Sequence, residues 1–234
     1  MLAMGEMIGN IAHQWRQPLS TITVAVTGLK FEQDNKMLTE KRLLEVLNRI
    51  HKTSNYLSST IDDFRNFYKT NKEKNSFLVS DMLQKSFSLI EVQLKNKNIQ
   101  LGKEIEDATL YTYENELIQV VINLINNSKD ELLRIENDNK LILIKTYLKN
   151  ETYEIVVYDS AGGVKENDIN RVFEPYFTTK DKSQGTGIGL YMSSEIICKH
   201  MKGKLSVKNE EFSYESSKYF GASFKIELPL EFNK

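Results

Sequence analysis

The sequence predicts an α+β protein: an N-terminal antiparallel helical hairpin that forms a dimeric four-helix bundle, followed by an α/β sandwich. Two long helical patterns fill the chain up to the region of Lys69, and short β-rich runs alternate with helices beyond it. That alternation favours a mixed sheet with helices on one face. The composition changes within the Lys/Asn-rich stretch 69–75, so we expect a linker there, between domains at residues 1–72 and 73–234.

Heptad patterns predict the hairpin. In the first helix the apolar tracks are Ile8, Trp15, Ile22, Leu29 and Met4, Ile11, Pro18, Ala25. The second helix repeats the pattern at Leu43, Leu47, Ile50, Ser54, Leu57, Ile61, Phe64 and Tyr68. Residues 32–36 contain no apolar side chain and can turn the chain. A single hairpin cannot bury two such seams, so we expect a homodimer in which two hairpins form the bundle.

The second part of the sequence alternates between strand and helix patterns. Residues 77–79 are expected to form a strand, and Asp81 is placed to cap a helix over 82–95. Further strands are expected at 99–105, 109–113, 141–148, 153–158, 204–208 and 219–228. Helices are expected at 114–134 and 189–200.

Composition and charge narrow the class of protein. Of 234 residues 40% are hydrophobic and 27% charged, with a formal net charge of −1. This balance is typical of soluble globular proteins. It provides no broad positive electrostatic potential that would attract nucleic acid or an anionic membrane. Without a membrane-spanning apolar run or a signal peptide, we expect a cytoplasmic protein, or the cytoplasmic part of a longer membrane-bound one. Cys198, the single cysteine, is expected to be buried.

His13 carries the first chemical signal. It follows Ile11 by two positions, which puts it on the outward face of the first helix. Neutral imidazole is a good nucleophile near pH 7, so a solvated histidine on a rigid helix can accept a phosphoryl group. Pro18, five residues later, removes a backbone hydrogen bond and is expected to bend the helix. Taken alone, His13 is more simply explained as an ordinary surface histidine.

An apolar-patterned helix carries two asparagines on one face. Asn123 and Asn127 are four residues apart, and their neutral oxygens suit a Mg²⁺ ion that already carries phosphates and water. A polar helix surface is the alternative. Asp159 follows a predicted strand, and Gly163 in the same loop permits close backbone approach. A tight turn would explain that loop as well.

Glycines at 185, 187 and 189 open the last predicted helix, where free amides and the helix dipole attract phosphate. Lys180 can add a compensating charge. The triplet is a weak signal by itself, because it lacks the spacing of a P-loop.

The run His13-Gln14-Trp15-Arg16-Gln17-Pro18-Leu19 resembles the phospho-acceptor box of sensor histidine kinases. In the commonest family form an acidic residue follows the histidine and takes its proton. Here Gln14 stands there, and an amide can accept a hydrogen bond but not the proton. Gln17 lies where many kinases carry the residue that orients water for dephosphorylating the partner, which leaves a phosphatase activity open.

The later segments resemble the ATP-binding domain of the same family, in its order and spacing. The resemblance implies that Asn127, with Asn123, holds Mg²⁺, and that Asp159 binds the exocyclic amine of adenine. Asn123 replaces the glutamate that activates water in related ATPases, which favours transfer over hydrolysis. Residues 171–180 resemble the phenylalanine box and ATP lid. The implied nucleotide-binding residues are Asn127, Asp159, Gly163, Lys180, Gly185, Thr186, Gly187, Gly189, Leu190 and Ser223.

This resemblance, from His13 to Pro229, implies a homodimeric enzyme that uses Mg-ATP to phosphorylate His13 and then transfers the group to an aspartate of a response regulator. Two other functions stay open. One is an ATP hydrolase of the same fold, which would label no residue. The other is a non-catalytic scaffold, for which Gln14 and Ala161, departures from the family form, are the hints.

Overall fold

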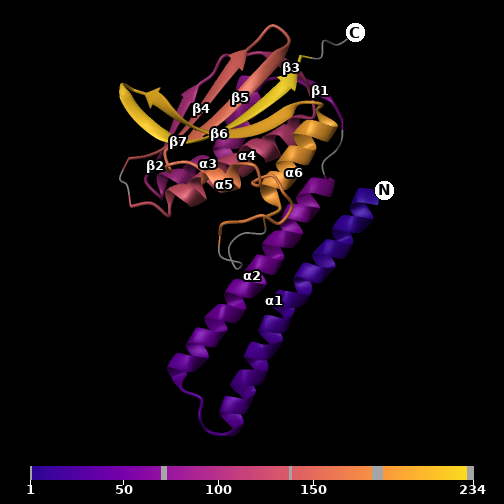
Figure 1. The fold of residues 1–234 in the computed structure, drawn as a ribbon, viewed down its shortest axis with the longest axis vertical. Helices are drawn as coiled ribbons and strands as arrows, with labels where there is room; N and C mark the ends of the chain where they lie inside the picture. Colours follow the sequence, from indigo (N-terminus) through magenta and orange to yellow (C-terminus); the bar gives the residue numbers. More distant parts are fainter. Residues whose placement is uncertain (1, 70–72, 137–138, 181–186, 231–234) are drawn as a thin grey trace. The chain divides into compact units, whose positions relative to one another are not determined.

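The computed structural model describes residues 2–69, 73–136, 139–180 and 187–230; at 2–15, 17, 56 and 59–69 it describes the backbone alone. The chain divides into two compact units, the first Met1–Tyr68 with Thr178–Thr186 and the second Lys69–Phe177 with Gly187–Lys234. Figure 1 follows the chain through both. Among the helices that are described, none has the length and apolar character needed to traverse a bilayer.

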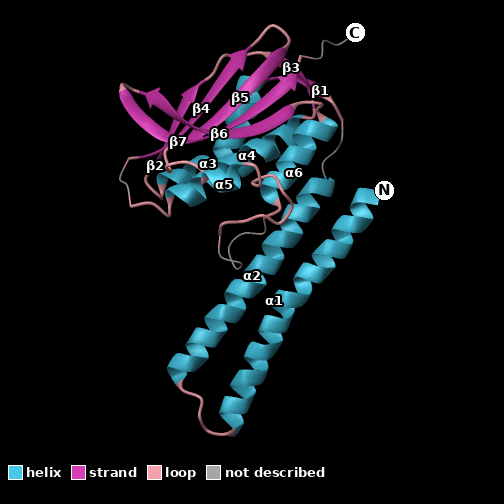
Figure 2. Cartoon of the chain, in the orientation of Figure 1, coloured by secondary structure: helices cyan, strands magenta, loops and turns pink. Residues whose placement is uncertain are grey.

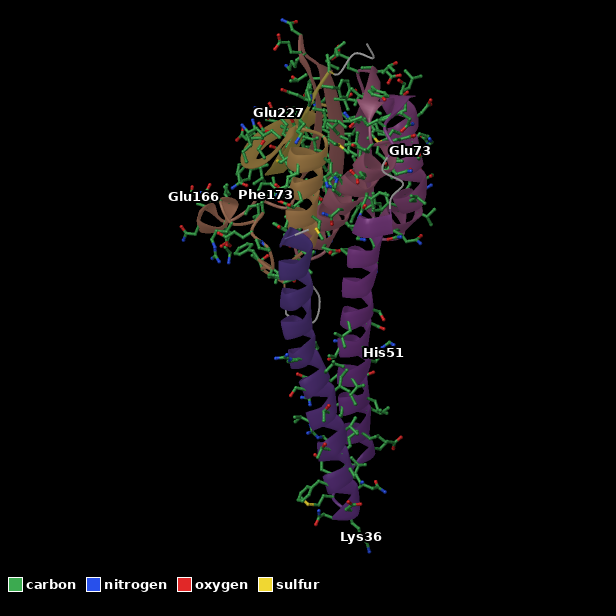
Figure 3. All side chains as sticks on the ribbon, turned by 90° about the vertical axis from the view of Figure 1, so that its right-hand side faces the viewer. Lys36, His51, Glu73, Glu166, Phe173 and Glu227 are labelled. Atoms are coloured by element: carbon green, nitrogen blue, oxygen red, sulfur yellow. The ribbon has the colours of Figure 1, made fainter. Side chains whose placement is uncertain are left out.

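The first unit is a hairpin of two long helices, α1 (Leu2–Asp34) and α2 (Glu40–Lys69), as the heptads predict (Figure 2). α1 continues through Pro18. Lys36 lies at the tip of the hairpin in Figure 3 and has a φ of +56°. Arg42 pairs with Glu32 across the turn at 3.2 Å, and its backbone N–H donates to Thr39 Oγ1 at 3.2 Å. Thr39 therefore caps the start of α2.

The apolar seams are only partly buried within one hairpin. Ala25 and Val46 are buried, whereas the seam residue Leu47 is 47% exposed. Among the side chains of the two helices that are described, the other large exposed apolar ones are Leu19, Val24, Val26, Phe31 and Leu44. A hairpin by itself thus leaves considerable apolar surface in water.

The second unit is built on a five-stranded mixed sheet in the order β2-β4-β5-β7-β6. Its strands are β2 (Ile99–Glu104), β4 (Lys140–Leu148), β5 (Thr152–Asp159), β6 (Lys204–Tyr214) and β7 (Ser217–Pro229). β2 runs parallel to β4, and the other neighbouring pairs are antiparallel. A second, two-stranded antiparallel sheet joins β1 (Asn75–Leu78) to β3 (Thr109–Thr112).

Helices cover one face of the large sheet (Figures 1 and 2). They are α3 (Val79–Lys95), α4 (Glu114–Leu132) and α6 (Gly189–Glu195), the last continuing as a π-helical turn over Ile196–His200. The short α5 (Glu166–Ile169) follows β5. The core between the layers contains Leu83, Phe87, Leu117, Leu124, Ile142, Ile155 and Ile226, none more than 1% exposed. The predicted fold class, a helical part followed by a mixed sheet covered on one face, is confirmed.

The other face of the sheet carries an aromatic cluster near the end of the β6–β7 hairpin. The ring centroid of Phe212 lies 4.9 Å from that of Tyr158 and 5.6 Å from that of Tyr219. Tyr214 reaches back to β2, where a Cβ atom added to Gly102 would lie 2.9 Å from the tyrosine ring. The last hairpin of the chain therefore packs against the first strand of the sheet.

Three local predictions were wrong. α3 begins at Val79, so Asp81 lies within its first turn instead of capping it. The acceptor is Asp107, whose carboxylate receives the Ser80 N–H at 3.0 Å and the Ser80 hydroxyl at 2.8 Å. Cys198 is exposed, because it lies on the solvent side of the π-helical turn. β6 extends to Tyr214, six residues beyond the predicted strand.

Candidate functional site

Asp159 ends β5 with its side chain on the helix-covered face, only 3% exposed. Its Oδ1 accepts the N–H groups of Ala161 at 3.0 Å and Ala222 at 3.4 Å, and its Oδ2 accepts the Ser128 hydroxyl at 3.1 Å. Burial raises the pKa of Asp159 to about 6, against the opposing effect of these three hydrogen bonds. A carboxylate whose protein donors only partly offset its burial is suited to a donor from a ligand.

The loop after Asp159 is held in one shape by contacts at both ends. Ser160 Oγ accepts the Leu141 N–H at 3.0 Å. Gly162 and Gly163 follow with φ of +86° and +87°, a region that favours glycine. The predicted loop glycine, Gly163, thus has a conformational reason as well as the expected closeness to a ligand.

The two predicted asparagines have different surroundings on α4. Asn123 Nδ2 donates to Ser193 Oγ of α6 at 2.8 Å, and a Cβ added to Gly189 would lie 2.6 Å from Asn123 Oδ1. Asn127 Nδ2 is buried and has no hydrogen-bond partner within the described residues. The structure therefore places Asn123 beside the start of α6 and leaves Asn127 Nδ2 without a partner among the described residues.

These residues fit a magnesium ion that is bound mainly by a nucleotide. Amide carbonyl oxygens are hard ligands, and Mg²⁺ usually keeps several waters and phosphate oxygens in its shell. The described residues contain no group of three or more His, Cys, Asp or Glu side chains that could hold a metal ion. Either asparagine could supply its carbonyl oxygen, because the hydrogen bond of Asn123 to Ser193 uses its Nδ2 and leaves Oδ1 for a cation.

Tight backbone contacts flank the segment that resembles an ATP lid. Gly187 has a φ of +63°, and its carbonyl accepts the Tyr176 N–H at 2.8 Å. A Cβ at Gly187 would lie 2.4 Å from the backbone of Tyr176, so only glycine fits. Before this contact, the Arg171 guanidinium lies 4.6 Å from the centre of the Phe177 ring, and half-buried Phe173 follows α5 (Figure 3). These contacts fix both ends of the segment within the second unit.

Other predicted residues fall outside this cluster or outside the description. Ser223 of β7 is fully buried, but its side chain lies on the face of the sheet opposite to that of Asp159. Its hydroxyl donates to the Lys208 carbonyl at 3.4 Å. It therefore does not join Asp159, because alternate residues of a strand point to opposite faces. Leu190 lies in the first turn of α6, and the N–H of Lys180 donates to Thr178 Oγ1 at 3.1 Å.

Gly185 and Thr186 lie outside the described residues. His13, Gln14 and Gln17 lie within α1, and their side chains fall outside the description.

Sequence reasoning missed three residues of the site: Ser128, Ser193 and Asn209. They contact Asp159, Asn123 and Val164 respectively, across separations of 31, 70 and 45 residues. No local pattern identifies such contacts, although the serine beside the asparagine pair could have been noted as a polar residue on an otherwise apolar helix face.

Two family models match this chain. Residues 3–73 match the His Kinase A (phospho-acceptor) domain, and residues 112–232 match the histidine kinase-, DNA gyrase B-, and HSP90-like ATPase family. The second match alone covers more than half of the chain, and the two together occur in the order expected for a kinase core. The chain belongs to the sensor histidine kinase family.

Relatives of this histidine kinase agree with that assignment. Sporulation kinase E of Bacillus subtilis is 29% identical over 237 residues, which cover 98% of this chain and 29% of the relative. The catalytic domain of histidine kinase ThkA is 26% identical with a TM-score of 0.56, covering 68% of this chain and 96% of that structure. A structure of ThkA in complex with response regulator protein TrrA matches 97% of this chain and 62% of that structure, at 24% identity and a TM-score of 0.68. The chain spans 25% to 51% of the length of the first five curated relatives.

Proposed function

We propose that this chain is the catalytic core of a sensor kinase that phosphorylates its own His13 with ATP and passes the phosphoryl group to an aspartate of a response regulator. The observation that carries the proposal is the buried carboxylate of Asp159 facing α4, the helix that bears Asn123 and Asn127. We take residues 1–72 as the phospho-acceptor domain and 73–234 as the ATP-binding domain, joined by a linker at 69–75.

Asp159 binds the adenine base. Its carboxylate accepts a hydrogen bond from the exocyclic amine, and the ionised form is the stronger acceptor for it. The glycine loop after it allows the base to approach the backbone closely. The raised pKa of Asp159 supports this role, since an added donor stabilises a carboxylate that burial has destabilised.

The start of α6 and the asparagine face of α4 hold the phosphate end. The backbone amides at Gly187 and Gly189 together with the helix dipole bind phosphate oxygens, and Lys180 adds a positive charge. Asn127 contributes its carbonyl oxygen to Mg²⁺, and Asn123 sets the position of α6 through Ser193. Bound there, the metal supplies charge neutralisation on the phosphates.

His13 is the acceptor. One ring nitrogen of neutral imidazole attacks the γ-phosphorus in line, the N–P bond forms as the bond to the bridging oxygen breaks, and the electron pair leaves with ADP. The ring proton then passes to water, because Gln14 has no site that can take it. Gln17 can orient water for the reverse regulatory step, dephosphorylation of the partner.

A homodimer and a regulator complete the assembly. The apolar side chains exposed on the hairpin, Leu47 and Phe31 among them, would be covered in a four-helix bundle of two copies. A receiver domain is the expected partner, and the related kinase ThkA has been solved with its response regulator protein TrrA. ATP and receiver domains are cytoplasmic, so we place this activity in the cytoplasm.

The proposal is tested by incubating the protein with γ-³²P-ATP and Mg²⁺ beside a His13→Ala variant. We expect an acid-labile, alkali-stable label on the wild-type protein and none on the variant, with both proteins binding ATP equally. His51 supplies a matched control: it lies exposed on α2 (Figure 3), so His51→Ala should be labelled normally.

Other outcomes favour the alternatives. Release of phosphate by both the wild-type protein and His13→Ala, without a labelled protein, would indicate a hydrolase. ATP binding without label or phosphate release would indicate a scaffold.

A further inference from the structure

Asn209 of β6 holds the far end of the loop that follows Asp159. Its Oδ1 accepts the Val164 N–H at 2.8 Å, and its Nδ2 donates to the Val164 carbonyl at 2.7 Å. One side-chain amide thus satisfies both backbone groups of one residue in a loop that has no strand partner there. An asparagine amide is suited to this task because it contains one acceptor and two donors.

The same amide packs against Gly163. A Cβ atom added there would lie 2.5 Å from Asn209 Oδ1 and 2.7 Å from its Cγ. Gly163 is therefore required by its φ of +87° and, separately, by the side chain on the neighbouring strand. The glycine that the family resemblance selects as a nucleotide contact and the asparagine that no motif selects form one packed unit.

The contacts at the two ends of the loop have different origins. At the first end Asp159 Oδ1 accepts the Ala161 N–H, so the carboxylate of the proposed base site itself shapes the loop. At the other end Asn209 fixes Val164 with two short hydrogen bonds. Two consecutive glycines with positive φ connect these ends, and glycine loses more conformational freedom on ordering than other residues. The Gly162 N–H also donates to the Phe220 carbonyl of β7 at 3.3 Å, so Asn209 supplies the attachment that follows Gly163.

We propose that Asn209 is a positioning residue for nucleotide binding, which holds Gly162 and Gly163 in the conformation that receives the base. This inference rests on the proposed function. It assigns to β6 a role in the site, although Asn209 itself need not touch the nucleotide. Loss of Asn209 is expected to lower the affinity for nucleotide and not the rate of transfer, because the loop lies at the base-binding carboxylate and not at the helix start that holds the phosphates.

The first test measures two things separately: the hydrogen bonds between Asn209 and Val164, called the clamp below, and their effect on nucleotide binding. In the full chain without nucleotide, Asn209→Ala should speed hydrogen exchange of the Val164 amide. Calorimetry with the non-hydrolysable analogue AMPPNP and Mg²⁺ should show binding about tenfold weaker. A change of this size corresponds to the net contribution of about one hydrogen bond to the binding free energy. The KM for ATP should rise by a similar factor, while the rate of His13 labelling at saturating ATP stays within twofold. The control is Asn150→Ala, an exposed asparagine in the β4–β5 turn, which should change none of these values.

A second variant distinguishes the clamp from general loss of packing. Asn209→Asp keeps an acceptor for the Val164 N–H but opposes the Val164 carbonyl with a carboxylate. Its affinity relative to wild type should be lowest near pH 8 and should recover toward pH 5, where the introduced carboxyl gains a proton that it can donate. The ratio for Asn209→Ala should not depend on pH. Taking each ratio to wild type removes the effect of Asp159, which titrates in both proteins.

Three results would overturn the inference. Unchanged exchange at Val164 in Asn209→Ala would remove the clamp. Faster exchange with AMPPNP binding within twofold of wild type would remove the link to nucleotide. An equal loss of affinity in Asn209→Asp at all pH values would show that Asn209 acts through packing and not through its hydrogen bonds to Val164. Failure of the wild-type protein to bind AMPPNP would refute the proposed function itself. This outcome is distinct from failure of the inference, because it is seen in the wild-type protein without any variant.

Discussion

Replacing Asp159 with asparagine is expected to stabilise the nucleotide-free protein at neutral pH while removing its affinity for adenine. The pKa of this carboxyl is raised from 3.8 to about 6 by burial. Roughly two pKa units at about 1.4 kcal/mol each correspond to about 3 kcal/mol of folding free energy. The amide carries no charge, can still accept the N–H groups of Ala161 and Ala222, and can donate to the Ser128 hydroxyl. Since hydrogen bonds to a neutral amide are weaker, we expect a net gain of about 1–3 kcal/mol at pH 7.5.

The sign of the pH dependence follows from the raised pKa. Between about pH 4 and 6 the folded protein retains a proton on Asp159 that the unfolded chain has released. The contribution of this group to stability therefore falls as pH rises through that window, and the full penalty is present above pH 6. Nucleotide affinity has the opposite dependence, because the ionised carboxylate accepts the adenine amine more strongly than the protonated carboxyl does.

The assay is urea unfolding followed by circular dichroism at pH 4.5, 6 and 7.5, on wild type and Asp159→Asn. Fluorescence of the single tryptophan, Trp15, would report on the first unit only. Asp107→Asn is the control: hydrogen bonds from Ser80 lower the pKa of Asp107, so its contribution to stability should be constant between pH 4.5 and 7.5 and be lost only at lower pH. A stability difference between wild type and Asp159→Asn that is the same at all three pH values, or a less stable variant at pH 7.5, would refute the reasoning.

Three further substitutions test other contacts of the site, and a fourth, Gly28→Ala, is a control outside it. Gly221→Ala places a Cβ 1.8 Å from the Asp159 carbonyl oxygen and should lower the free energy of unfolding by about 3 kcal/mol or more. Gly28→Ala, in a helix with nothing within 4 Å of the added Cβ, should be neutral or stabilising by up to about 1 kcal/mol. Thermal unfolding checks both variants, and equal melting temperatures would contradict the packing described. Asn127→Ala should weaken AMPPNP binding about 10–100-fold with Mg²⁺ but little in EDTA, and a loss equal in both conditions would exclude a metal ligand. Ser193→Ala removes the acceptor for Asn123 and should raise the KM for ATP several-fold with a stability loss of about 1 kcal/mol, measured by labelling kinetics and urea unfolding; an unchanged KM would show that this contact does not position α6.

The sequence was sufficient for the features that depend on periodicity. Heptads located α1 and α2, because burial on one face imposes a repeat on a helix, and short β-rich runs located every strand of the large sheet. The position of Asp159 at a strand end was likewise predictable, since a buried run that stops at a carboxylate and two glycines marks both the strand and its loop.

Features set by distant contacts were not predictable. The start of α3 is fixed by Asp107, a residue 27 positions from Ser80, so the local signal at Asp81 was misleading. Asn209 appeared as one polar residue in a strand, and its role depends on where the loop of Val164 lies in space. Ser223 was assigned from a motif, yet the register of β7 turns its hydroxyl to the face away from Asp159.

The packing of the β6–β7 hairpin against β2 has a consequence for the order in which the chain becomes native. Tyr214 lies over Gly102, and Gln100 donates to Glu215 at 3.3 Å, across 115 residues of sequence. During synthesis the first edge of the sheet emerges long before the hairpin that covers it, and contacts of such separation form slowly. A ribosome that stops before residue 212 would release a sheet with an uncovered apolar face at Leu141 and Leu143. The second unit is therefore expected to complete folding only after nearly the whole chain has been made, while the hairpin of local helices can form early.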